Sequence, residues 1–250
     1  MIPISDDDSD RTLTPYVNYL LIAVNILVFV FLQQFGNNLD FTYSYSTVPG
    51  EILTGNDIVT GAKIIHDDVS GQDFQLPGLG VTNIPVYLTL ITSMFMHGGL
   101  AHIGGNMLYL WVFGDNIEQR LGHLKYLFFY LLTGVIASMT HVFVENFMGH
   151  DLLVPSLGAS GAISGVLGGY ILLFPTRRVN MWLGFLILPV PAFIALGIWI
   201  VFQVLNGMGS LGGQEAAGVA YSAHIGGFVA GLLLIKFFAS RVRESVRNYR

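Results

Sequence analysis

Long apolar runs separated by short polar segments dominate this chain of 250 residues. A helix that spans a membrane needs about 20 apolar residues to cross roughly 30 Å of hydrocarbon. Six runs are candidates for such helices: residues 16–35, 100–113, 124–144, 160–174, 191–205 and 219–239. The pattern therefore predicts an all-α membrane protein folded as a six-transmembrane-helix bundle.

The basic residues support this count and orient the chain. Loops on the cytoplasmic side of a membrane carry an excess of Lys and Arg. Ten of the 11 basic residues lie in the N-terminal segment, after the second run, after the fourth run or at the C-terminal end, and only Lys63 lies elsewhere. We expect residues 1–15 and the basic tail 240–250 to be cytoplasmic. The membrane domain then covers residues 16–239, with a long non-cytoplasmic loop at about 36–99.

The amino-acid composition further restricts the class of protein and the kinds of site it can hold. Hydrophobic residues make up 53% of the chain and charged residues 11%, far from the roughly 25% charge of soluble domains. The chain has no cysteine, which excludes thiol nucleophiles and thiolate metal sites. Residues 88–96 are apolar but too short to span, so we expect them to lie in the outer interface or to re-enter the membrane.

Two of the six runs are short. Residues 160–174 cover only about 22 Å as a helix, and Arg177 and Arg178 mark their cytoplasmic end. Ser160 should therefore begin a helix below the outer surface. The run 100–113 is also too short to cross the hydrocarbon, because Gly114 and Asp115 are expected to end it. Irregular backbone at such depth is tolerated where it lines a wet cavity, so we expect a water-filled recess that opens outward.

Few polar side chains lie inside the runs, and four of them should share one depth in the outer half of the membrane. His102 and Asn106 are four residues apart and share a helix face. His224 lies about six residues into the last run, level with Ser160. A serine hydroxyl becomes a nucleophile when a neutral imidazole accepts its proton, and nearby donors can stabilise the resulting oxyanion. Ser164, inside a helix, is expected only to bond its own backbone.

Small residues form stripes on the fourth and sixth runs, which allows close helix approach. On their own, such stripes are typical of helix packing with polar side chains as hydrogen-bonding contacts. The match in depth between Ser160 and His224 favours a catalytic role for Ser160 instead, because it places a base beside the hydroxyl.

Four motifs in order resemble the rhomboid family of intramembrane serine proteases: "HGGLAHIGGN" at 97–106, "EQR" at 118–120, "GASG" at 158–161 and "AHIGGFVAG" at 223–231. The similarity covers about residues 94–239 and the first run. It implies a rhomboid-type bundle with catalytic Ser160 (nucleophile) and His224 (general base), an oxyanion hole of His102, Asn106 and the Ser160 backbone, and structural roles for His97, Glu118, Arg120, Gly227 and Gly231. In this implication Glu118 and Arg120 form a structural pair.

Two positions depart from the family pattern. Some relatives have Trp-Arg where this chain has Leu88 and Thr89, so what stabilises the first outer loop is open. Others have an aromatic residue one turn after the nucleophile, against which the imidazole stacks, and this chain has Ser164 there. What orients His224 is therefore also open. Trp111, Trp182 and Trp199 are expected to be lipid-facing or interfacial anchors.

The resemblance implies an endopeptidase that cleaves single-span membrane proteins within the lipid bilayer, at a site that opens to the non-cytoplasmic side. No cofactor, metal or nucleic acid is expected, since the histidines form no HExxH pair and no basic patch is present. We expect a bacterial cytoplasmic membrane. Two alternatives are a catalytically silent rhomboid-like protein that binds membrane helices, and a channel or transporter that uses the polar cavity.

Overall fold

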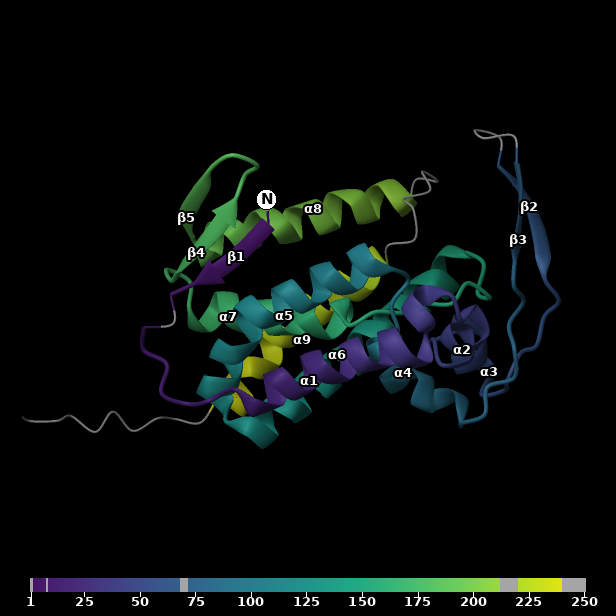
Figure 1. Cartoon of the computed structure of the whole chain (residues 1–250), viewed down its shortest axis with the longest axis horizontal. Helices are drawn as coiled ribbons and strands as arrows, with labels where there is room; N and C mark the ends of the chain where they lie inside the picture. The colour runs from purple at the N-terminus through teal and green to yellow at the C-terminus, as the bar shows by residue number, and fades with distance from the viewer. Residues whose placement is uncertain (1, 8, 68–71, 212–219, 240–250) are drawn as a thin grey trace, which may run out of the picture.

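The computed structural model describes residues 2–7, 9–67, 72–211 and 220–239, so the basic tail 240–250 lies outside the described residues. Its long helices run side by side along the long axis of the molecule (Figure 1). They are α1 (Tyr16–Leu27, continued by the π-helical Val28–Leu32), α5 (Leu100–Leu121), α6 (His123–Met148), α7 (Ser160–Leu173), α8 (Ala192–Leu211) and α9 (Tyr221–Phe238). Each matches one of the six predicted spans.

Length and apolar composition identify the membrane-spanning helices. The helices α6, α8 and α9 each meet these criteria for a span, and α5 meets them together with the bent segment Val86–Phe95 that precedes it. The helix Tyr16–Leu32 and α7 are shorter and apolar. The protein is therefore an integral membrane protein with a helical bundle, as the apolar pattern predicted.

The centre of the bundle is α7, which packs against α9 through glycines. A Cβ atom at Gly227 would lie 2.1 Å from the carbonyl oxygen of Gly161, and one at Gly231 would lie 1.9 Å from that of Gly165. Real Cβ atoms do not approach a carbonyl so closely, so both positions require glycine if the two backbones are to touch. This close approach brings the first turns of α7 and α9 together.

The second span is longer than predicted. Gly114 and Asp115 lie buried inside α5, which continues to Leu121 over 22 residues, so the expected end of the helix at these residues is wrong. Gly114 is there for packing: a Cβ atom would lie 2.1 Å from Oδ1 of Asn18 on α1. Asp115 pairs with Arg11. Both residues resemble helix-ending signals in sequence, but here they serve contacts with the N-terminal segment.

Glu118, near the inner end of α5, anchors the start of α1. Its carboxylate accepts the backbone N–H groups of Val17 at 2.9 Å and Asn18 at 2.7 Å, and it also contacts Nδ1 of His123. The expected pair with Arg120 is not formed by this buried carboxylate, and Arg120 is exposed. Residues two apart on a helix point to different faces, which explains the difference.

Replacing Glu118 with alanine should therefore destabilise the protein, whereas replacing Arg120 should not. Glu118→Ala leaves one buried and one partly buried N–H group of α1 without their carboxylate acceptor, and we expect a loss of at least about 2 kcal/mol. Arg120→Ala should change stability by no more than about 0.5 kcal/mol. Thermal melting in detergent micelles measures both. Equal losses for the two variants would support the Glu118 and Arg120 pair instead.

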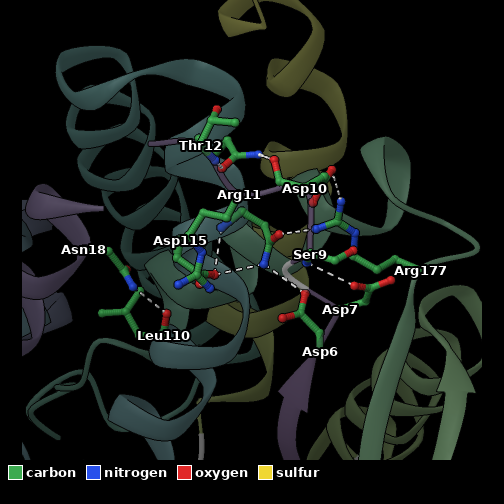
Figure 2. A network of polar contacts seen from close by, with 12 residues as sticks. Asp6, Asp7, Ser9, Asp10, Arg11, Thr12, Asn18, Leu110, Asp115 and Arg177 are labelled. Carbon is green, nitrogen blue, oxygen red and sulfur yellow. Dashed lines mark hydrogen bonds and ion pairs between the residues drawn. The ribbon is translucent and has the colours of Figure 1, made fainter. Parts of the chain in front are cut away.

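A small sheet at one end of the bundle was not predicted. Its strands are β1 (Ile2–Asp6), β4 (Arg178–Trp182) and β5 (Ile187–Pro191), antiparallel in the order β1, β4, β5 (Figure 1). The segment after β1 is tied to the helices by Asp10, which pairs with Arg177 at 2.6 Å, and by Arg11, which pairs with Asp115 (Figure 2). The N-terminal segment thus contacts both α5 and the loop between α7 and β4, and β5 leads directly into α8.

The long loop between α1 and α5 is folded against the end of the bundle away from the small sheet (Figure 1). It contains α2 (Leu39–Ser44), α3 (Pro49–Thr54), the hairpin β2 (Lys63–Asp67) with β3 (Gln72–Leu76), and a bent segment made of 3-10 turns η3 (Val86–Leu88) and η4 (Ser93–Phe95) around α4 (Thr89–Thr92). This bent segment meets α5 at 82°, so residues 88–96 do not continue the span.

Hydrogen bonds from Thr47 and Gln33 hold this loop in place. The Thr47 hydroxyl contacts the Thr89 carbonyl at 3.0 Å and the Ser93 hydroxyl at 2.9 Å. The Gln33 amide bonds both the N–H and the C=O of His97, each at 2.9 Å. These contacts stabilise the loop where some family members have Trp-Arg.

Candidate functional site

The fourth span begins at Ser160, as its sequence predicted. Gly158, two residues earlier, has a φ of 125°, a backbone conformation that favours glycine. Its N–H donates to the Ser93 carbonyl at 2.9 Å, which ties the start of α7 to the outer loop. As the first residue of α7, Ser160 has no helical partner for its backbone N–H. A hydroxyl and an N–H donor are thus presented together at the outer end of α7.

The structure brings His224 of α9 to this point. Nε2 of His224 lies 2.7 Å from Oγ of Ser160, although the two residues are 64 positions apart in sequence. His224 is the fourth residue of α9, which begins at Tyr221, so it is closer to the helix start than the predicted six residues. The glycine contacts between α7 and α9 make this short distance possible.

One side chain of α5, His102, lies beside the start of α7. Nδ1 of His102 accepts the Gly98 N–H at 3.3 Å, so the other ring nitrogen, Nε2, carries the proton of the neutral imidazole. This Nε2 lies within 2.8 Å of where a Cβ atom of Gly158 would stand, and so beside the start of α7. The arrangement gives a hydrogen-bond donor next to Ser160.

Asn106, one turn further along α5, has a buried amide whose Nδ2 has no hydrogen-bond partner among the described residues. A buried donor left unpaired costs about 1 to 3 kcal/mol. A catalytic role is one of the explanations for such a group in a folded protein. His97 packs against His102. Its ring is fully buried and meets the His102 ring edge to face, with centroids 5.1 Å apart.

The contacts of His224 on its other side were missed by sequence reasoning. Nδ1 of His224 lies 2.7 Å from Oε1 of Gln203 on α8, and the Trp199 ring lies 6.1 Å from the imidazole between centroids. Trp199 is half-buried and packs against the core, whereas Trp111 and Trp182 are exposed. Ser164 donates to the Ser160 carbonyl at 2.7 Å, the backbone bond expected of it. The signal in the sequence was a lone amide, Gln203, within an apolar run.

These residues lie in the part of the chain that is similar to known proteins. A family model described as "Rhomboid domain" matches residues 85–241. Rhomboid protein 1, mitochondrial, from Saccharomyces cerevisiae is 31% identical over 164 residues, which cover 65% of this chain and 45% of the relative. Rhomboid protease GluP from Bacillus subtilis is 27% identical over 226 residues, which cover 90% of this chain and 34% of the relative.

A third relative, Presenilin-associated rhomboid-like protein A, mitochondrial, from Danio rerio, is 31% identical over 157 residues, covering 60% of this chain and 37% of the relative. The chain thus spans less than half the length of each of these curated relatives.

Proposed function

Because the chain belongs to the rhomboid family, we propose that it is an intramembrane serine endopeptidase that cleaves single-span membrane proteins with Ser160 and His224. The observation that carries the proposal is the distance of 2.7 Å between Oγ of Ser160 and Nε2 of His224. This distance lies within the range of about 2.6 to 3.2 Å over which a base can take a proton from a nucleophile. The name of the GluP relative, a rhomboid protease, supports the same activity.

In the proposed reaction, Oγ of Ser160 attacks the carbonyl carbon of the substrate peptide bond while its proton passes to Nε2 of His224. The imidazolium then gives this proton to the leaving amine as the C–N bond breaks, which leaves an ester on Ser160. Water attacks the ester with His224 again as general base, which releases the carboxylate product and restores the serine. No cofactor takes part in these steps.

The tetrahedral intermediates carry a negative oxygen that needs donors. We assign these to the Ser160 backbone N–H, the His102 Nε2–H and the Asn106 Nδ2–H groups. The lack of a partner for the Asn106 amide in the described part of the chain supports this role, because a donor that becomes bonded only in the reaction stabilises the transition state over the ground state. Removing one such donor typically costs about 3 to 4 kcal/mol in the barrier.

Substrate must enter from the lipid, and we propose α8 as the mobile element that admits it. In the most apolar stretch of α8, 17% of the residues are buried, against 39% in α6 and 33% in α9. The helix α8 is therefore the least enclosed of the three. A cavity of about 110 Å³ between α5 and α8 is lined by Pro3, Tyr109, Phe113, Met181, Ala195, Leu196, Ile198, Trp199 and Phe202. The substrate helix must also unwind, because its own hydrogen bonds shield its peptide carbonyls.

The orientation in the membrane is part of the proposal. Arg11 and Arg177 lie close together in one network of polar contacts (Figure 2). Ser160 begins α7, and Arg177 follows the opposite end of that helix. Basic residues favour the cytoplasmic side, so the site would open to the non-cytoplasmic side with both termini in the cytoplasm. We propose a bacterial cytoplasmic membrane, which the Bacillus relative supports, while the relatives named mitochondrial support a mitochondrial membrane.

Because the chain has no cysteine, the orientation can be tested with single introduced thiols. An Asn56→Cys variant in the outer loop should react with a membrane-impermeant maleimide in intact cells of a bacterial host. An Arg120→Cys variant at the inner end of α5 should react only after the cells are opened. The reverse pattern would contradict the proposed orientation.

Two other functions stay possible on family and composition grounds. A silent rhomboid-like protein would bind membrane helices without cutting them, and a transporter would pass solute through the polar recess. The short contact between Ser160 and His224 favours the protease over both, because neither alternative uses an acceptor for a serine proton.

Reconstitution separates the three functions. The purified protein in liposomes with a single-span test protein, whose membrane segment contains small and helix-destabilising residues, should release two fragments cut in or near that segment. Stable association without cleavage would favour the silent binding protein. Solute flux across the liposome membrane without cleavage would favour the transporter.

A further inference from the structure

The imidazole of His224 has a hydrogen-bonding partner on α8. Nδ1 of His224 lies 2.7 Å from Oε1 of Gln203, while Nε2 of the same ring lies 2.7 Å from Oγ of Ser160. An amide oxygen only accepts hydrogen bonds, so Nδ1 must be the protonated nitrogen of the neutral imidazole. Nε2 then carries the lone pair and faces the serine hydroxyl. This is the tautomer that a general base for Ser160 needs.

The surroundings of Gln203 suggest a specific role for its amide. Its neighbours Val201, Phe202, Val204 and Leu205 are exposed large apolar side chains of α8. Within the described residues, the Gln203 side chain makes its hydrogen bond with His224. A polar amide in such an apolar stretch is unfavourable unless it bonds across to another helix.

Trp199 strengthens this link between α8 and the imidazole. It lies one turn before Gln203, and its ring stands 6.1 Å from that of His224 at an interplanar angle of 35°. The ring of Trp199 also lies 6.1 Å from Phe228 on α9. The imidazole is therefore held from α8 by a hydrogen bond and a ring contact, whereas on α7 the position one turn after the nucleophile is occupied by Ser164, which bonds the Ser160 backbone.

We propose that Gln203 is a positioning residue that fixes the tautomer and orientation of His224, so that α8 completes the reactive pair. The proposal rests on the proposed function of Ser160 and His224. It follows that the pair is competent while α8 lies against α9, and loses its orienting partner when α8 moves away. Gln203 itself touches no reacting atom.

A purely structural Gln203, which only holds α8 against α9, would make different predictions. Removing a packing contact would lower the melting temperature and change KM through substrate entry. Removing an orienting acceptor should instead lower kcat and the reactivity of Ser160 toward a small probe. A conservative replacement that keeps an acceptor should rescue the second effect.

The test compares Gln203→Leu, which removes the acceptor at similar size, with Gln203→Glu, which keeps one. Asn206→Leu is the matched control, because Asn206 is exposed on α8 and its amide bonds only the Phe202 carbonyl of its own helix in the described structure. Each protein in liposomes is assayed for kcat and KM with the single-span test protein, for the rate of Ser160 labelling by a fluorophosphonate, and for its melting temperature.

We expect Gln203→Leu to lower kcat and the labelling rate together by about 10 to 100-fold, less than the full 10²–10⁴ of a general base, with KM within about twofold. Gln203→Glu should recover most of both rates, and Asn206→Leu should match the parent. If Gln203→Leu melts early, Gln203→Met replaces it as the acceptor-free variant.

Unchanged rates in the acceptor-free variant would overturn the positioning role while leaving the protease assignment intact. The role is also overturned if the leucine and glutamate variants lose activity alike, or if the loss appears only in KM. If the parent protein neither cleaves nor labels, the proposed function fails, and the inference falls with it.

Discussion

Alanine in place of Ser160 is expected to abolish cleavage of a single-span test protein in liposomes, lowering kcat by at least about 10³-fold. The variant has no hydroxyl to form the ester. Nε2 of His224, which lies 2.7 Å from Oγ of Ser160 in the parent protein, then has no hydroxyl to deprotonate. Ser160 is partly exposed at the start of α7, so its truncation should leave the melting temperature nearly unchanged.

Ser164→Ala is the matched control for this experiment. It removes a hydroxyl from the same helix one turn later, where the side chain is buried and donates to the Ser160 carbonyl. We expect a loss of about 1 kcal/mol in stability and retained cleavage. Undiminished cleavage by Ser160→Ala, or loss of cleavage only in Ser164→Ala, would contradict the assignment of the nucleophile.

Alanine in place of Gly231 is expected to disrupt the site without touching it. The added Cβ atom would stand 1.9 Å from the Gly165 carbonyl oxygen, and the obstacle is backbone that cannot turn aside. The two helices must separate, which we expect to cost at least about 3 kcal/mol and to lower labelling of Ser160 more than about tenfold, because His224 moves with α9.

Gly197→Ala makes the same chemical change on α8, where an added Cβ atom meets nothing within 4 Å. This control should keep both its melting temperature and its activity. Thermal melting and fluorophosphonate labelling measure both variants under one condition. A Gly231→Ala protein that melts and reacts like the parent would show that the close contact of α7 and α9 is not what holds the pair together.

Much of the helical architecture could be predicted because bilayer thickness constrains the length of each apolar run. The start of α7 at Ser160 followed from a short apolar run whose inner end was marked by Arg177 and Arg178. The approach of α9 followed from glycines at 227 and 231. These inferences depend on local composition and helix rise, which the sequence displays directly.

The parts that could not be predicted depend on contacts between distant segments. Gly114 and Asp115 look like a helix end, yet each is explained by a partner on the N-terminal segment, Asn18 and Arg11. The pairing of β1 with β4 joins Ile2–Asp6 to Arg178–Trp182, which are far apart in the sequence, and no local pattern records it. Gln203 was missed for the same reason: its meaning depends on His224, which lies across the interface between α8 and α9.

Labelling of the native protein in liposomes with a fluorophosphonate, followed by mass spectrometry of its peptides, tests the central assignment most directly. Activated serines form a stable phosphonate ester with this reagent, and the His224 acceptor should activate Ser160 alone among the serines of the chain. The account predicts one modified peptide carrying the adduct on Ser160, and none in His224→Ala. A protein that stays unmodified while fully folded, or one modified at another serine, would contradict it.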